Sequence, residues 1–131
     1  MEGLRRAVGD HDIDAVVACF AEDYRNETPV HPGRGFEGRD QVRVNWQRIL
    51  GGLPDVAARV LRVVEDGAVV WSEWEIGGHR PDGRAELLRG VIVFGVEDDL
   101  LAWSRFYLEP VDDGTDDVDA AVGRLVGADS P

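Results

Sequence analysis

The chain is 131 residues long, with 44% hydrophobic and 31% charged residues and a formal net charge of −12. This length predicts a single domain with a hydrophobic core. The acidic charge argues against nucleic acid or an anionic membrane as a partner, because both need a basic surface. All fourteen basic residues are arginine, which excludes lysine Schiff-base chemistry and the lysine-containing phosphate loop.

The one cysteine, Cys19, lies in the apolar helical run "AVVACF". The chain therefore cannot form an intrachain disulfide, and the thiol is expected to be structural. No segment reaches the roughly 18 apolar residues of a membrane span, and the N-terminus has no signal-peptide pattern. We expect a cytoplasmic protein with no membrane partner.

The first half of the sequence predicts helices. Residues 4–8 form a short helical pattern, and a second pattern begins after Asp12, a suitable N-cap. Its apolar residues at helical spacing are Ile13, Val16, Val17 and Phe20. A short strand is expected at 24–28, before prolines and glycines break the chain. Residues 38–54 predict a further helix, whose apolar stripe is Val42, Trp46, Ile49 and Leu50.

From Pro54 onward the apolar pattern has the period of two that strands require. It predicts strands at 55–64, 68–76, 84–94 and 100–109, joined by hairpin turns. Helices followed by a curled antiparallel sheet predict an α+β domain. We expect this domain to span residues 1–110, and an acidic tail, partly helical or disordered, to occupy residues 111–131.

The predicted strands are apolar on both faces, whereas a sheet covered on one side alternates apolar with polar residues. We therefore expect helices on one face and a second copy of the chain on the other, which gives a homodimer. In "WSEWEI" (71–76), Glu73 is expected to face outward and to pair across strands with Arg89. The residues expected at the dimer interface are Trp71, Glu73, Arg89, Val91, Val93 and Phe106.

Several segments, in their order and spacing, resemble the nuclear-transport-factor-2-like superfamily and its SnoaL-like group. They are "DIDAVVACFAEDYRNETP", "FEGRDQVRVNWQRIL", "EDGAVVWSEWEI", "RGVIVF" and "LLAWSRFYLEP", within residues 4–110. The group includes ketosteroid isomerase, limonene-epoxide hydrolase and polyketide cyclases. The resemblance implies a cone-like fold, in which a strongly curled sheet closed by N-terminal helices surrounds a central pocket and dimers form through the outer sheet face.

The resemblance also allows the catalytic residues of the isomerase to be sought. Its proton-shuttling aspartate corresponds to Thr28, its protonated aspartate to Gly90, and its oxyanion tyrosine falls near Leu4. That chemistry needs one carboxylate to move the proton and a second acid to hold the oxyanion. Steroid isomerisation is therefore not expected.

The catalytic set of the epoxide hydrolase is not matched either. Its first-strand pair corresponds to Asn26 and Thr28, its arginine and first aspartate to Trp74 and Ile76, and its last aspartate to Arg105. The acid of the polyketide cyclases varies in position, and we expect no inward carboxylate on the later strands to serve in its place.

By the same resemblance the inward face is aromatic and apolar, as small-ligand pockets commonly are. The expected lining is Phe20, Asn26, Thr28, Trp46, Ser72, Trp74, Ile76, Leu88, Gly90, Ile92, Trp103, Arg105 and Tyr107. Plain core packing is the alternative for Trp74 and Trp103.

Arg105 is the first candidate for chemistry. It either pairs with a protein carboxylate such as Glu27 or Glu109, or faces an anionic or enolate group of a ligand. A slip of one residue would turn it outward. His31, near the expected pocket mouth, and Tyr24 are the candidate acid–base groups, although a lone loop histidine is more often a solvated side chain.

Three functions remain open at this point. The chain is an isomerase-, cyclase- or hydrolase-type enzyme for a hydrophobic oxygenated molecule, a binding or accessory domain with the same pocket, or a structural dimer module with a filled interior. The three histidines are not at metal-ligand spacing, so we expect no metal and no cofactor.

Overall fold

The structure is a computed structural model that describes residues 2–127. The elements are α1 (Glu2–Gly9), α2 (Ile13–Ala18), β1 (Phe20–Glu27), the 3₁₀ helix η1 (Pro32–Arg34), β2 (Phe36–Glu37), α3 (Arg39–Gly52), β3 (Ala57–Asp66), β4 (Val69–His79), β5 (Ala85–Glu97), β6 (Leu100–Pro110) and α4 (Val118–Leu125). The predicted helices and strands are present with bounds shifted by a few residues, but the placement of Phe20 on the second helix is wrong, because α2 ends at Ala18 and Phe20 begins β1.

The six strands form one mixed sheet in the order β2-β1-β6-β5-β4-β3. The prediction of an α+β fold is confirmed, but that of an antiparallel sheet is wrong for one pair, because β1 and β6 are parallel. Strands β3 to β6 are successive hairpins and must alternate in direction. Strand β1 reaches the sheet from the helices and is under no such constraint. The strongly curled, cone-like shape stays a prediction.

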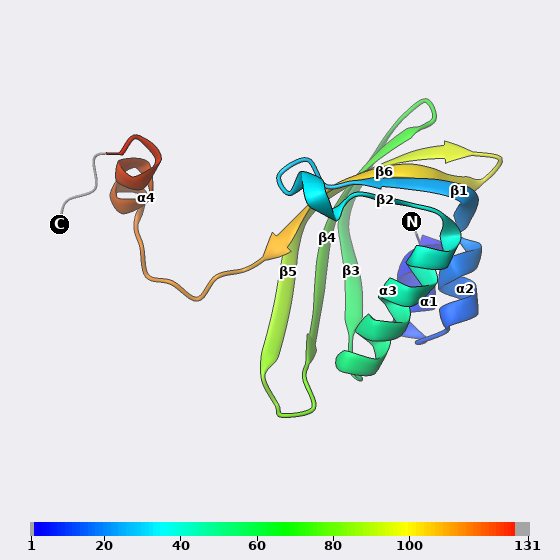
Figure 1. The fold of residues 1–131 in the computed structure, drawn as a ribbon, viewed down its shortest axis with the longest axis horizontal. Helices are drawn as coiled ribbons and strands as arrows, with labels where there is room; N and C mark the ends of the chain where they lie inside the picture. Colours follow the sequence, from blue (N-terminus) through cyan, green and yellow to red (C-terminus); the bar gives the residue numbers. More distant parts are fainter. Residues whose placement is uncertain (1, 128–131) are drawn as a thin grey trace.

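Helices α1, α2 and α3 lie together on one side of the sheet (Figure 1). Asp12 caps α2 as predicted, since its carboxylate accepts a 3.1 Å hydrogen bond from the backbone N–H of Ala15. In α3, Val42 is buried, and Trp46, Ile49 and Leu50 pack at the edge of the core. The predicted apolar stripe of this helix therefore faces the sheet.

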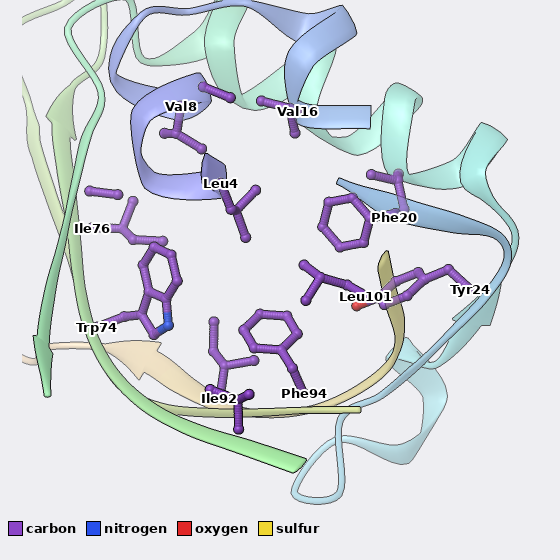
Figure 2. Packing of buried hydrophobic residues seen from close by; sticks show 14 of the residues in the cluster. Leu4, Val8, Val16, Phe20, Tyr24, Trp74, Ile76, Ile92, Phe94 and Leu101 are labelled. Carbon is purple, nitrogen blue, oxygen red and sulfur yellow. The ribbon is translucent and has the colours of Figure 1, made fainter. Parts of the chain in front are cut away.

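The core lies between these helices and the sheet (Figure 2). Leu4 and Val8 from α1 point toward Trp74 of β4, which is 1% exposed, and Phe94 of β5, which is fully buried. Side chains of even number in β4 and β5 thus face the helices, as the period of two predicts. This inward face positions the candidate site.

Beyond β6, residues 111–117 lead to α4, which stands apart from the rest of the chain (Figure 1). A helix is therefore present in the predicted tail. The division into a domain and a tail stays a prediction, and residues 128–131 of that tail lie outside the described residues. Within residues 2–127, no helix is long and apolar enough to span a membrane.

Candidate functional site

A cavity of about 230 Å³, here called the β1 cavity, lies between α3 and the inward face of β1. Its walls are largely aromatic and aliphatic, with a few polar side chains among them. It is lined by Phe20, Tyr24, Asn26, Thr28, Arg34, Phe36, Val42, Asn45, Trp46, Ile49 and Phe106. The predicted lining residues Phe20, Asn26, Thr28 and Trp46 are therefore brought together here.

A buried polar cluster forms one wall of the β1 cavity. Asn26 Oδ1 accepts hydrogen bonds from the Tyr24 hydroxyl at 3.2 Å and the Ser104 hydroxyl at 2.9 Å, and the two hydroxyls also contact each other. Burial raises the pKa of the Tyr24 phenol above its usual value. The cluster is thus neutral near pH 7 and fixed in orientation.

The Asn26 amide keeps spare donor capacity. Its Oδ1 is oriented by two hydroxyl donors, so Nδ2 points the other way, where it makes a 3.4 Å hydrogen bond to Thr28 Oγ1. An amide nitrogen carries two hydrogens, and among residues 2–127 the second has no protein acceptor. The cavity wall can therefore donate a hydrogen bond to a ligand oxygen.

A second cavity, the hairpin groove, lies next to the first at the β4–β5 hairpin end of the sheet. It has a volume of about 340 Å³ and is almost wholly apolar. It is lined by Trp46, Ile49, Leu53, Ile76, Glu86, Leu88, Phe106 and Leu108. The two cavities share Trp46, Ile49 and Phe106 as lining residues, so they are adjacent.

Glu86 is a wall residue that the sequence analysis missed. Its carboxylate Oε1 lies 2.9 Å from Arg80 Nη2 and 3.4 Å from Arg84 Nε, and its side chain is 28% exposed. Among residues 2–127, no other carboxylate lines either cavity. The expectation of no inward carboxylate on the later strands is therefore wrong. The parity of Leu88, expected inward, would have placed Glu86 on the same face.

Four of the predicted lining residues belong to the core or to the sheet backbone. Trp74 Nε1 donates a 2.7 Å hydrogen bond to Ser72 Oγ, which donates in turn to Ile92 O at 2.7 Å, and all three residues are buried. Gly90 lines neither cavity. It lies against the neighbouring strand, where a Cβ would run into the backbone of Tyr107 and Leu108. Of the two alternatives for Trp74, the structure therefore shows core packing rather than a place in a cavity wall.

Trp103, Arg105 and Tyr107 were expected to face inward, and that placement is wrong. Phe94, which is inward, pairs with Ser104, so the even residues of β6 face the pocket. The cause is a β-bulge at Ala102: Val96 pairs with Leu101 and Gly95 with Trp103. One extra residue reverses the parity of the rest of the strand.

The three candidates for chemistry are therefore separated. Arg105 lies on the outer face, about half exposed, with its Nη1 3.8 Å from Glu27 Oε2. His31 Nε2 lies 2.8 Å from Glu109 Oε1, and His31 does not line the β1 cavity. Only Tyr24 contributes directly to a cavity wall.

The outer face carries five of the six residues expected at a dimer interface. Trp71 is 51% exposed, whereas Val93 is only 4% exposed and already covered by its neighbours. Phe106 was also expected there, but it lines both cavities, because the same bulge turns it inward.

The predicted cross-strand ion pair of β4 and β5 also differs from the observed one. Arg89 Nε contacts Glu75 Oε2 at 2.9 Å, and Glu73 is opposite Val91 instead. The predicted register differs from the observed one by two residues. Each side chain therefore stays on its predicted face, but the residue opposite Arg89 is Glu75 instead of Glu73.

Among residues 2–127, no three His, Cys, Asp or Glu side chains come together as a protein metal site would require. Chemistry by this chain's own residues would depend on Glu86, on Tyr24 or on the Asn26 amide. A carboxylate can accept a proton, and the amide can hold a developing negative charge on oxygen.

The model of the SnoaL-like domain matches residues 1–103, and the chain therefore belongs to the SnoaL-like domain family. A search of curated proteins found no match. Solved structures share the fold at 13–21% sequence identity.

Three of these structures illustrate the fold. A Mycobacterium tuberculosis protein in complex with estradiol-17β-hemisuccinate has a TM-score of 0.71 and 18% identity, over 81% of this chain and 88% of that one. An epoxide hydrolase from M. tuberculosis, of the limonene-epoxide-hydrolase-like type, has a TM-score of 0.70 and 21% sequence identity, over 82% of this chain and 78% of that one. IdmH from Streptomyces antibioticus, a proposed polyketide cyclase, has a TM-score of 0.70 and 20% sequence identity, over 82% of this chain and 88% of that one.

Proposed function

We propose that this chain binds a small hydrophobic molecule with an oxygen function in the pocket formed by the β1 cavity and the hairpin groove. The observation that carries the proposal is the second Nδ2 hydrogen of Asn26, which has no acceptor among residues 2–127. Asn26 is 6% exposed and lies in the wall of a largely apolar cavity. Nδ2 donates one of its two hydrogens to Thr28 Oγ1, and the second can be donated to a ligand. A ligand carbonyl, hydroxyl or ether oxygen would satisfy it.

The open interior argues against a structural dimer module with a filled core. Such a module would need tryptophans to occupy the pocket. Trp103 lies on the outer face, Trp74 is packed in the core, and Trp46 forms a wall, while cavities of about 230 and 340 Å³ remain. Space of this size suits a small ligand.

Calorimetric titration with cyclohexanone, 2-decalone and estradiol-17β-hemisuccinate tests the proposal. Ile49→Trp fills the wall that both cavities share, and should abolish the binding of any compound that the native chain binds. Val44→Trp is the matched control, since Val44 is on the same helix and 41% exposed. Failure of all three compounds, or equal binding by the Ile49 variant, would count against the pocket.

A second candidate function, acid–base catalysis on the same class of molecule, is favoured by one observation. In the part of the chain that the structure describes, Glu86 is the only carboxylate in the walls of the two cavities, and it lines the hairpin groove rather than the β1 cavity that holds Asn26. The positions that match the isomerase and hydrolase catalytic residues hold none of their acids, so neither of those two routes is available. Any chemistry would use a different set, with Glu86 as the proton acceptor.

Exchange of the α-protons of cyclohexanone in D₂O, followed by NMR, tests this second function. Glu86→Gln should reduce the exchange by about 10²-fold or more if the carboxylate takes the proton. Glu97→Gln, an exposed change on the same strand, should leave it unaltered. Ligand binding without exchange in the native chain would identify a binding protein rather than an enzyme.

The chain is also proposed to form a homodimer through the outer face of β3 to β6. Val64 and Trp71 are directly opposite each other on β3 and β4, and they are 63% and 51% exposed. Val91 pairs with Tyr107, which is 38% exposed, on the neighbouring strands. Large exposed apolar side chains on one sheet face, here with charged residues such as Glu73 and Arg105 among them, favour contact with another protein surface.

A further inference from the structure

The C-terminal helix α4 is well formed but has no buried face. Asp117 caps its N-terminus with a 2.9 Å hydrogen bond from Ala120 N, and Arg124 Nη2 lies 2.7 Å from Asp116 Oδ2. Val118, Val122 and Leu125 are 72%, 50% and 83% exposed. Their spacing of four and three residues places these side chains on one side of the helix.

An isolated helix of eight residues is not stable in water, because a few hydrogen bonds do not offset the cost of nucleation. Stability normally comes from packing an apolar face against another element. None of the α4 side chains belongs to the hydrophobic core, and Figure 1 shows the helix held away from the other elements. The apolar side of α4 therefore needs a surface to cover it.

The hairpin groove offers such a surface next to the point where the tail leaves the sheet. Strand β6 ends at Pro110, opposite Leu88, whereas β5 continues to Ala85 and so has no neighbouring strand on its β6 side beyond that point. Leu88 and Leu108, at this step in the sheet, are both groove residues. The mouth of the groove is thus uncovered where β6 stops.

The connection has the length and the starting point needed to reach that mouth. Val111 N donates a 2.9 Å hydrogen bond to Leu87 O, which holds the start of the tail at the rim of the groove. Residues 112–117 are free of helix and strand, and Gly114 N donates to Asp112 Oδ1 at 3.1 Å, which turns the chain. Extended, the seven residues 111–117 span at most about 25 Å. A tether this short favours an intramolecular contact.

We propose that α4 is a lid, which folds back over the hairpin groove of its own chain and packs Val118, Val122 and Leu125 against Leu53 and Leu88. Closure covers the opening beside Glu86 and removes water from the apolar walls. The arrangement drawn in Figure 1 is then the open state, in which a ligand can enter. This inference concerns the tail and does not depend on the identity of a ligand.

Disulfide trapping tests the lid in the full chain. Cys19 is the only cysteine, so a Cys19→Ser background allows pairs to be introduced. Leu53→Cys with Leu125→Cys should form an intrachain disulfide under mild oxidation, read by mass spectrometry. Val64→Cys with Leu125→Cys is the control, since Val64 is 63% exposed but lies toward the other end of the sheet, opposite Trp71 rather than Ile76. It should give no intrachain product.

Hydrogen exchange of the tail provides a readout that needs no cysteine. Amides of residues 118–125 should exchange at least about tenfold more slowly than in Leu125→Asp, and equally at low and high protein concentration. Val64→Asp, which adds the same charge to the outer face, should leave the protection unaltered.

Three results would overturn the lid. They are no protection of α4 in the native chain, a Leu53–Leu125 disulfide that joins two chains, or protection that depends on concentration or on Val64. The last two would mean that α4 docks on a second copy. None bears on ligand binding in the β1 cavity, so the lid and the pocket can fail separately.

Discussion

The indole Nε1 of Trp74 donates a 2.7 Å hydrogen bond to the hydroxyl oxygen of Ser72, two residues earlier on the same strand. Both side chains are 1% exposed. Ser72 Oγ donates its own hydrogen to the backbone oxygen of Ile92 at 2.7 Å, so one serine satisfies a buried donor and a buried acceptor. The largest fully buried side chain is thereby fixed in orientation on the inward face of the sheet.

Replacement of Ser72 by alanine should therefore be costly for so small a change. The Trp74 N–H would lose its acceptor in a site that water cannot reach, which should lower the free energy of unfolding by about 1–3 kcal/mol. Urea unfolding followed by tryptophan fluorescence measures the difference. Thr115→Ala, an exposed loss of a hydroxyl in the tail, is the control and should have little effect. An equal midpoint for Ser72→Ala would contradict the argument.

Gly90 should tolerate no side chain. It has φ +154°, and a Cβ would approach the backbone of Tyr107 and Leu108 on the neighbouring strand. Gly90→Ala should lower the free energy of unfolding by at least about 1–3 kcal/mol, because the backbone must shift or leave its conformation. Gly33→Ala, where a Cβ has nothing within 4 Å, is the matched control. Thermal unfolding of the two variants compares them directly.

Because the Tyr24 phenol is buried, we expect the protein to lose stability at alkaline pH. Burial raises the pKa of its phenol above 10.0, the value for an exposed tyrosine, so above that pH the unfolded chain releases a proton that the folded chain keeps. Its contribution to stability is fully present below pH 10 and is lost as the pH rises toward the folded pKa. Urea unfolding at pH 8, 10 and 11 should show this decline.

To isolate the effect of Tyr24, the other groups that titrate at alkaline pH must be absent or replaced. No lysine is present to titrate in this range. Burial also raises the pKa of the Cys19 thiol, which acts in the same direction, so the comparison belongs in a Cys19→Ser background. There Tyr24→Phe should flatten the decline and Tyr107→Phe should preserve it. The same slope in all three chains would exclude Tyr24 as its source.

The sequence was sufficient for the elements and for the faces of β4 and β5, because a period of two is a local property of the chain. It was not sufficient for β6. The bulge at Ala102 adds one residue after the turn, and nothing in "LLAWSRFYLE" marks it. The exchange of Trp103 for Ser104 on the inward face followed from that one residue.

The site was partly predictable for the same reason. Asn26 and Thr28 were found because the family resemblance gave the inward positions at the end of β1, which Thr28 follows directly. Glu86 was missed although the predicted strand 84–94 contains it, because the expected inward face was not followed from Leu88 to the start of the strand. The partner of Arg89 required the length of the hairpin loop, which leaves His79 opposite Ala85, and loop length could not be read from the glycines alone.

Trp71 should control the association of two chains. It is 51% exposed on the outer face, opposite Val64 on one side and Val93 on the other. Aromatic residues in such positions commonly contribute about 2 kcal/mol or more to an interface, which is roughly 30-fold in the dissociation constant. Trp71→Glu should therefore convert a dimer at micromolar concentration into a monomer, as measured by sedimentation velocity.

The control and the opposing result for Trp71 are equally specific. Val30→Glu adds the same charge at a residue that is 61% exposed in the loop after β1, and it should leave the dimer intact. A native chain that sediments as a monomer at these concentrations would contradict a dimer altogether. A dimer that survives Trp71→Glu but not Leu125→Asp would place the contact at α4 instead. The outer sheet face would then need another explanation for its apolar residues.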